Sequence, residues 1–597
     1  MKYKKYLIFT SIKSLIPKNK NVKIIYCSES AIPNLSSKYW SGKKFFLNKA
    51  TWHKKNHLLE DYKYICILSD RITLHLANKL NKIHKKNFSQ RFWNILIGSY
   101  VKSFITVYFD KWHLLKNSIK LNKIDYVNFI KIKNSQLKAY EMYDYGELLD
   151  NDYWHQKIYQ NIAILFFKKE QIKLIKSEKS FLSDKDANLP FLKKILFFIF
   201  NKIFITKYYK YFIILTYTGF WNELILNIKL KQFPFFFDNL LNFFYFKKKL
   251  NLCKNKINNN LREFINKNFL YKSDFEKNLS KNLIYEMPSI FIENYKDFEK
   301  ASKIINFPTR TKKIFLSNGL CYSSLISYYV ASQVDRGSKL FIGQHGGSYG
   351  ISKFNIQEDH EKKISDKYLT WGWSDSKKSN KTIKAFIFLK KLKIKDQNLN
   401  FNRISVILAP RFVHIKSIDS CHGSTSYFNY INFIESYLFK IPEKFRKNIF
   451  IKLPNSHILD FEKIDISSKI RKYFKFYQKE SFAEVCSSSN LLIHTANSTS
   501  MLEALSSNIP SLILLDKEQN LINHSAKKYF KLLKKNKILH YDTSDAANFL
   551  QKLLNSDINK WWFKDEVQKS VNLFCDKYAR RFNLIKKIRT LNKIILS

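Results

Sequence analysis

One short segment of this chain, GQHGGSYG, combines an imidazole with an unusual density of glycine. Four of the chain's twelve glycines fall within its eight positions: Gly343, Gly346, Gly347 and Gly350. Glycine lets a backbone turn sharply or approach a ligand closely. A cluster of glycines also leaves the side chains between them uncovered by neighbouring side chains. An imidazole with an ordinary pKa of about 6.5 suits a general base at neutral pH. We therefore predict His345 as the base and Gln344 as a second catalytic residue, against the alternative of a hydrogen-bonded structural histidine.

A second polar group follows in the stretch EDHEKKISDKYLTWGW. Its titratable side chains include Glu358, His360, Glu361 and Asp366. From this group we place Glu361 with the catalytic residues. The alternative is that the stretch forms an exposed, charged turn of helix.

Residues 491–516 have the sequence pattern of a phosphate-binding site, LLIHTANSTSMLEALSSNIPSLILLD. An apolar strand ends there, a small polar turn follows, and a helix begins. A helix N-terminus offers free N–H groups and a partial positive charge, so we assign donor phosphate to the turn residues Asn497, Ser498, Thr499 and Ser500. Glu503, one turn into the helix, could take the ribose hydroxyls. The alternative is that Ser500 and Glu503 form a capping box that serves only helix stability.

Other residues near strand ends could neutralise a leaving group. They are Arg411, Lys452 and His494, which could face a cleft. Cationic side chains there would stabilise a diphosphate without a metal. The alternative is that each is an ordinary surface charge. Gly346 and Gly347 join the donor-binding residues because bare backbone can approach a ligand. The sequence contains no Walker loop and no HExxH motif. We therefore expect no metal and no cofactor, with a nucleotide-activated donor as substrate.

The elements that must position these residues alternate along the chain. The apolar residues 339–342 predict a buried strand that ends at the glycine cluster. The end of a strand is the usual position of an active site in α/β proteins. In the second half, short apolar runs alternate with helical patterns, as in a doubly wound parallel sheet: 404–409, 448–453, 473–477, 491–494, 511–515 and 538–541. The first half offers fewer strands: 6–12, 22–27, 312–318 and 368–373. The predicted fold class is α/β.

The domain organisation follows from the same pattern. We predict a first α/β domain over residues 1–375, with a mainly helical, aromatic elaboration at about 90–300 that holds one strand candidate, 203–208. Residues 376–400, rich in Lys and Asn, are predicted to link it to a second domain. That domain covers 401–560, and a basic helical tail, 561–597, is expected to pack back across the first domain.

Composition limits the partners and the compartment. The 597 residues carry a formal net charge of +56, which alone would suggest nucleic acid or an anionic membrane surface. The basic residues are mostly lysine and are spread along the whole chain, so we expect no specific nucleic acid and, at most, peripheral contact with an anionic membrane. Seven scattered cysteines without a CxxC pair favour a reducing compartment. We expect the protein in the cytoplasm, with the inner membrane as its nearest anionic surface.

At these strings the chain resembles the transferases encoded in bacterial O-antigen and surface-polysaccharide gene clusters. The resemblance runs from about residue 5 to about residue 585 and includes LLEDYKYI, LANKLNKIH, FWNILIGSYVKSFITVYFDKW, NELILNIKLKQFP, GQHGGSYG, HEKKISDKYLTWGW and HTANSTSMLEAL. It implies a glycosyltransferase-B-like (GT-B-like) architecture, in which two Rossmann-like domains face a cleft. It also implies transfer of a sugar or similar group from a nucleotide-activated donor to a glycan or lipid-linked acceptor.

The chain is more distantly similar to the polyol-phosphate transferases that use CDP-glycerol. Those enzymes carry a His-Gly motif after a strand, and a serine-rich turn before a helix with a glutamate. His345-Gly346 and Ser498, Thr499 and Glu503 fall on these patterns. The chain departs from them at Lys452-Leu453-Pro454, where a His-Pro dipeptide is usual, and at His494-Thr495, where an acidic residue is usual. The donor's identity therefore stays open.

We predict a metal-independent transferase of surface-glycan assembly, in which the second domain holds the donor and the first holds the acceptor. His345 would deprotonate the acceptor hydroxyl. The alternatives are a polyol-phosphate transferase of the CDP-glycerol type, an inactive structural relative, and a non-catalytic basic protein that docks on nucleic acid or anionic lipid.

Overall fold

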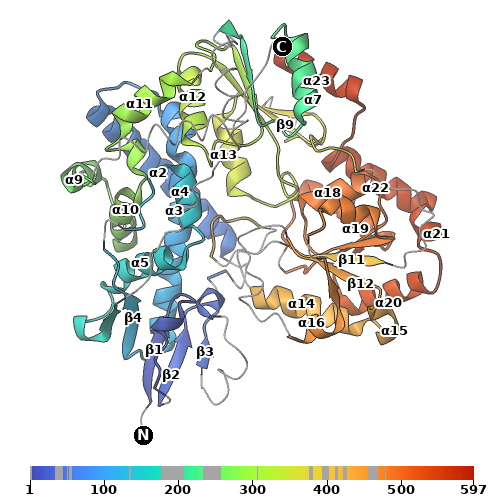
Figure 1. Cartoon of the computed structure of the whole chain (residues 1–597), viewed down its shortest axis with the longest axis horizontal. Coiled ribbons are helices and arrows are strands. Elements are labelled where there is room, and N and C mark those ends of the chain that lie inside the picture. Colours follow the sequence, from blue (N-terminus) through green and yellow to red (C-terminus); the bar gives the residue numbers. More distant parts are fainter. Residues whose placement is uncertain are drawn as a thin grey trace.

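The computed structural model of this chain contains three parallel β-sheets flanked by helices (Figure 1). The structure describes residues 3–19, 21–33, 45–49, 51–52, 57–133, 136–176, 208–232, 257–305, 307–375, 381–392, 403–409, 414–420, 427–454, 468–477, 479–518 and 520–596. The α/β class and the Rossmann-like parallel sheets that the sequence predicts are confirmed.

The N-terminal sheet has the strand order β3-β2-β1-β4-β5. Its strands are β1 (Lys4–Ile8), β2 (Val22–Tyr26), β3 (Phe45–Leu47), β4 (Tyr126–Ile130) and β5 (Ile172–Ile175). All of its neighbouring strands are parallel, and the order reverses between β1 and β4. Such a reversal is typical of Rossmann-like folds.

The middle sheet carries the glycine cluster. Its order, β10-β9-β8-β7-β6, follows the chain without a reversal. The strands are β6 (Tyr211–Ile213), β7 (Lys313–Leu316), β8 (Lys339–Gly343), β9 (Lys367–Thr370) and β10 (Thr382–Lys384). Because all five are parallel, the loops after β6, β7 and β8 meet at one edge.

The C-terminal sheet has the order β13-β12-β11-β14-β15-β16. Its strands are β11 (Ile404–Ile407), β12 (Ile449–Lys452), β13 (Lys475–Phe476), β14 (Leu491–His494), β15 (Ser511–Leu514) and β16 (Leu539–His540). The order reverses between β11 and β14, which is the point where open α/β sheets bind ligands, outside the carboxyl ends of the strands.

Helices fill the space between the sheets. In the first half they are α2 (Leu58–His84), α3 (Gln90–Leu121), α4 (Met142–Leu148), α5 (Asp152–Ala163), α7 (Phe220–Lys229), α9 (Asn259–Asn266), α10 (Asp274–Glu286), α11 (Tyr295–Ile304), α12 (Ser324–Asp335) and α13 (Ile356–Ile364). Figure 1 shows α3 running from the N-terminal sheet toward the middle sheet. Its side chains are buried along most of its length, so it forms a shared core for both sheets.

Helices of the second half cover the C-terminal sheet and then return to the first half. They are α14 (Tyr427–Lys440), α15 (Glu443–Arg446), α16 (Ser468–Tyr473), α17 (Phe482–Ser487), α18 (Thr499–Ser506), α19 (His524–Lys535), α20 (Thr543–Leu554), α21 (Ile558–Trp562), α22 (Asp565–Tyr578) and α23 (Leu584–Leu596). The turn after α22 joins the middle sheet: Ile387 N donates to Arg580 O (2.8 Å), and Arg580 N donates to Trp371 O (2.9 Å). The tail thus lies against the first half of the chain.

Two features of the first half differ from the sequence prediction. The segment 90–300 is not only helical, since it also supplies β4, β5 and β6, and it therefore completes a separate N-terminal sheet. These strands are three to five residues long, too short to stand out within a long aromatic stretch. Most of the strand expected at 203–208 lies outside the described residues, and β6 begins only at Tyr211.

The predicted linker 376–400 is also different where the structure describes it. Residues 382–384 form β10, the edge strand of the middle sheet, and the next four side chains, Ala385, Phe386, Ile387 and Phe388, are all fully buried. The expectation of a polar connection is therefore wrong for 381–392. The apolar sequence AFIF explains this burial, because removing apolar side chains from water is favourable.

Candidate functional site

The glycine loop, residues 343–350, touches the start of α18 directly. A Cβ atom at Gly347 would lie 2.3 Å from Thr499 N and 2.5 Å from Ser498 O, so no residue with a side chain fits there without movement. In addition, Gly347 N donates to Thr499 Oγ1 at 3.0 Å. The two motifs, 152 residues apart in the chain, therefore form one site between the carboxyl edges of the middle and C-terminal sheets.

Gln344 holds the glycine loop in shape. The residue is fully buried, and its Oε1 accepts from Trp371 N (3.0 Å) and from Trp373 Nε1 (2.7 Å). Its Nε2 donates to Gly346 O at 2.8 Å. The amide is thus engaged on both sides by the protein, and the geometry gives Gln344 a positioning role in place of the catalytic one predicted.

His345 lies at the end of β8 with its two ring nitrogens facing different partners. Nδ1 is 3.6 Å from Glu361 Oε1, slightly longer than a hydrogen bond, and Nε2 is 3.4 Å from the Tyr349 hydroxyl. The side chain is 16% exposed. Burial lowers the pKa of His345 to about 4, so the imidazole is neutral at pH 7.

Glu361 reaches the same point from α13. Its carboxyl group accepts from Gln357 Nε2 (3.0 Å) and from the Tyr368 hydroxyl (3.3 Å). Burial raises the pKa of Glu361 to about 8. The carboxyl is buried, as are Glu358 and His360 beside it, so the alternative of an exposed charged turn is wrong for this helix.

His345 and Glu361 act as a pair whose proton count depends on pH. With Glu361 ionised, the Nδ1–H of His345 can point at the carboxylate, which leaves the Nε2 lone pair free to take a proton. With Glu361 protonated, the carboxyl proton faces Nδ1 and the ring hydrogen moves to Nε2. In that state Nε2 cannot accept a proton. The state of the Glu361 carboxyl, whose pKa burial raises to about 8, therefore decides which ring nitrogen of His345 carries the hydrogen.

Tyr217 borders His345, and the sequence analysis missed it. Its ring lies nearly parallel to the His345 ring, at 10° with 6.2 Å between centroids, and its hydroxyl accepts from Asn318 Nδ2 at 2.8 Å. Leu215 and Tyr217 both have positive φ, 53° and 60°, which costs energy for residues with large side chains. Such strain is often kept at functional sites. The only sequence signal was Gly219 after a short apolar run.

Between the end of β14 and the start of α18, two buried polar side chains have no hydrogen-bond partner. They are His494, at the end of β14, whose two ring nitrogens are both unpaired, and Asn497, whose amide nitrogen and oxygen are both unpaired. Both residues are almost completely buried. An unsatisfied buried polar group costs about 1–3 kcal/mol, so two of them within four residues favour a ligand that supplies the missing partners.

The hydroxyl groups of the turn are already engaged. Ser498 is the N-cap of α18, with its Oγ accepting from Met501 N (3.4 Å) and lying 2.8 Å from Ser500 Oγ, while Thr499 Oγ1 accepts from Gly347 N. Because Ser498 is the cap, the alternative of a Ser500–Glu503 capping box is wrong. Glu503 lies further along α18, where burial raises its pKa and the charge of Arg581 opposes that rise.

The structure describes two of the three cationic residues predicted near strand ends, Lys452 and His494. Ile407 of β11 is in register with Lys452 on one side and with His494 on the other, so these two side chains share one row and one face of the sheet. Lys452 is buried, which lowers its pKa, and the carboxylates of Glu480 and Glu484 attract its charge. Arg411 lies outside the described residues.

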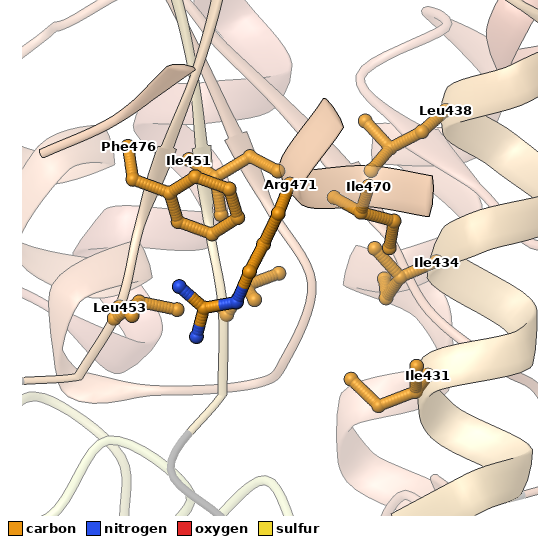
Figure 2. Close-up of a pocket in the computed structure, with 9 residues that line it drawn as sticks. Ile431, Ile434, Leu438, Ile451, Leu453, Ile470, Arg471 and Phe476 are labelled. Carbon is orange, nitrogen blue, oxygen red and sulfur yellow. The ribbon is translucent and has the colours of Figure 1, made fainter. Parts of the chain in front are cut away.

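An apolar pocket opens beside the carboxyl ends of β11 and β12 (Figure 2). Its walls come from strands β11–β13 and from helices α14 and α16: Leu408, Ile431, Ile434, Leu438, Ile451, Leu453, Ile470, Arg471 and Phe476. Arg471 extends into it near Phe476 and Leu453. The guanidinium is the only charged group among these residues.

Within the described ranges, no three His, Cys, Asp or Glu side chains gather in a way that could hold a metal ion. No helix in that part of the chain combines the length and the apolar character needed to cross a bilayer. Metal independence remains a prediction.

Comparison with known proteins places the chain in a family. Among solved structures it is similar to UDP-GlcNAc 2-epimerase from Neisseria meningitidis, crystallised with UDP-GlcNAc, at 12% identity and a TM-score of 0.31 over 50% of this chain and 81% of that one. No curated protein matches it significantly. The model of the LIC12162 family of transferases matches residues 5–592, almost the whole chain. The chain therefore belongs to the LIC12162 family of transferases.

Proposed function

We propose that this transferase moves a sugar or similar group from a nucleotide-activated donor to an acceptor hydroxyl, as a glycosyltransferase of surface-glycan assembly, with His345 as the general base. One observation carries the proposal: the Gly347–Thr499 contact brings a neutral, buried histidine next to a turn that holds unsatisfied polar groups. A base and a ligand-binding turn on facing sheets are the parts that group transfer requires.

On the acceptor side, Nε2 of His345 takes the proton of the attacking hydroxyl. Glu361, facing Nδ1, orients the ring and stabilises the imidazolium that forms. The acceptor oxygen forms a bond to the transferred carbon as the bond from that carbon to the donor phosphate breaks. The nucleotide leaves as an anion, and the proton stays on His345.

On the donor side, we assign the first contacts to His494 and Asn497, since these side chains lack partners in the protein. The N-terminus of α18 adds partial positive charge to this region, which favours an anionic donor. Thr499 and Ser498 are less suited than the sequence predicted, because their hydroxyls are engaged and Gly347 packs on the first turn of the helix. A phosphate bound there would have to displace the glycine loop.

The test is thermal stabilisation of the purified protein by CMP, CDP, UDP, GDP, dTDP and ADP, each with EDTA and with Mg²⁺. A nucleotide at 100 times its Kd adds about 2.7 kcal/mol to the free energy of unfolding. We expect one base to be selected, and the same shift with EDTA. Stabilisation by no nucleotide under either condition would contradict the proposal.

Release of nucleotide from the selected donor then separates an active transferase from an inactive relative. A donor that transfers a phosphorylated polyol would leave a nucleoside monophosphate, as the CDP-glycerol alternative requires. A sugar donor would leave a diphosphate in most cases.

A further inference from the structure

Two helices distant in the sequence, α7 and α23, pack against each other at one edge of the molecule (Figure 1). Both leave large apolar side chains in solvent. On α7 these are Phe220, Trp221 and Ile228, and on α23 they are Leu584, Ile585 and Leu596. Trp221 is 71% exposed and Ile585 is 61% exposed, which is unusual for residues of this size.

The exposed side chains are a second face of helices that already have a buried one. Leu226 of α7 and Ile588 and Leu591 of α23 are buried and attach the pair to the protein. On the solvent side, Ile585, Arg589, Lys593 and Leu596 recur at helical spacing, so one stripe of α23 carries two basic groups between two apolar ones.

The charge of this pair has one sign. The α23 sequence LIKKIRTLNKIIL contains no carboxylate, and α7 contains one, Glu223. That carboxylate points inward, where its Oε1 accepts from Thr216 N (3.0 Å) and Thr216 Oγ1 (2.5 Å). The exposed charges of the two helices are therefore lysines and an arginine: Lys229, Lys586, Arg589 and Lys593.

We propose that this α7–α23 face docks on the surface of a bilayer that contains anionic lipids. Exposed Trp, Leu and Ile between basic residues is the composition of helices that lie in the membrane interface, where apolar groups enter the acyl boundary and basic groups meet the headgroups. A nucleic acid would use the charges but leave Trp221 and Ile585 in water. A second copy of this chain would repel a face of the same charge.

Docking in this way would bring the site close to the membrane. Tyr217 is only four residues before Trp221, and its ring lies next to His345. The β6–α7 loop thus connects the docking face to the acceptor side. If the proposed function holds, the acceptor is lipid-linked; docking itself does not depend on any transfer activity.

Vesicle sedimentation tests the proposal with the full chain and no nucleotide. Phosphatidylcholine vesicles with and without 30% phosphatidylglycerol are compared, at about 0.1 M and about 0.5 M salt. We expect binding to the anionic vesicles, and about tenfold weaker binding for the double variant Trp221→Ser/Ile585→Ser. A charge variant, Lys586→Gln/Arg589→Gln/Lys593→Gln, should weaken binding by about tenfold or more at the lower salt.

The matched control replaces two exposed apolar residues on other helices, Ile67→Ser on α2 and Leu121→Ser on α3, and should bind like the unaltered protein. Thermal unfolding confirms that all variants fold. Binding that 0.5 M salt abolishes and that Trp221→Ser/Ile585→Ser leaves unchanged would show adhesion to any polyanion and overturn the proposal. Competition by RNA that removes the protein from vesicles would overturn it as well.

Discussion

The glycine loop, residues 343–350, and the serine turn, residues 494–500, meet in one site but satisfy their polar groups differently. In the glycine loop, Gln344 has its amide hydrogen-bonded on both sides, and Gly350 N donates to Glu358 Oε2 at 2.9 Å. In the serine turn, His494 and Asn497 are buried without a partner. In the glycine loop His345 Nδ1 is the buried side-chain atom that lacks a partner, whereas in the serine turn every polar side-chain atom of His494 and Asn497 lacks one.

This difference assigns the two regions different tasks. A network with its hydrogen bonds made keeps side chains in one geometry, which suits a base that must be aimed before the substrate arrives. Unsatisfied buried groups lower stability until a ligand supplies their partners. We therefore expect changes in the glycine loop to affect turnover or folding, and changes in the serine turn to affect nucleotide binding.

The largest effect is expected from His345→Ala. Loss of a general base lowers turnover by about 10²- to 10⁴-fold, while nucleotide stabilisation should stay unchanged because the donor contacts lie across the interface. Initial rates and thermal shifts measure the two quantities separately. His524→Ala, an exposed histidine on α19, is the control. Near-normal turnover in His345→Ala would show that another group takes the proton.

Gly347→Ala tests the contact itself. The added methyl group would meet Thr499 N at 2.3 Å, so the two sheets must separate or strain, and the free energy of unfolding should fall by about 3 kcal/mol. Denaturant unfolding measures this change. Gly146→Ala is the matched control, since it lies within α4 with nothing within 4 Å of the new Cβ and should be neutral or slightly stabilising. Equal stability of both variants would mean that the loop and helix do not pack in solution.

Glu361→Gln tests the pH dependence of the pair. The pKa of Glu361 is raised from its unfolded value of 4.5 to about 8, so the stability that this carboxyl contributes is full below pH 4.5 and is lost as pH rises through about 8. The amide cannot ionise. Relative to the unaltered protein, the free energy of unfolding of Glu361→Gln should therefore rise by about 4 kcal/mol between pH 5 and pH 9.

The same variant should change the pH–rate profile. The unaltered enzyme is expected to gain activity with an apparent pKa of about 8, as the carboxylate forms and Nε2 of His345 becomes free. In Glu361→Gln that limb should disappear. A profile with the same limb in both proteins would assign the titration to another group.

The smallest effect is expected from Asn497→Ala. Removing an unpaired amide relieves its burial cost but leaves a cavity, so the stability of the ligand-free protein should change by less than about 1 kcal/mol. The Kd of the selected nucleotide should rise about tenfold, which is about 1.4 kcal/mol. Asn555→Ala, an exposed asparagine after α20, is the control. Large destabilisation with unchanged nucleotide binding would reverse the comparison between the two regions.

Sequence patterns predicted the C-terminal sheet more completely than the first half. All six strands expected there overlap β11 to β16, because strands and helices alternate and each run of apolar residues is bounded by turn residues. In the first half the patterns located β1, β2, β7, β8 and β9, but not β3, β4, β5 or β10. Those four strands are three to five residues long, too short to stand out from the segments around them.

The sequence by itself determined which residues could do chemistry. Glycine spacing and strand ends indicated His345, and a small polar turn before a helix indicated Asn497; both signals depend on residues within a few positions. Tertiary structure alone decided that Gly347 lies on Thr499, that Glu361 faces His345, and that Tyr217 borders the ring. Contacts and pKa values of this kind depend on burial and on charges brought together from distant segments, which local patterns do not encode.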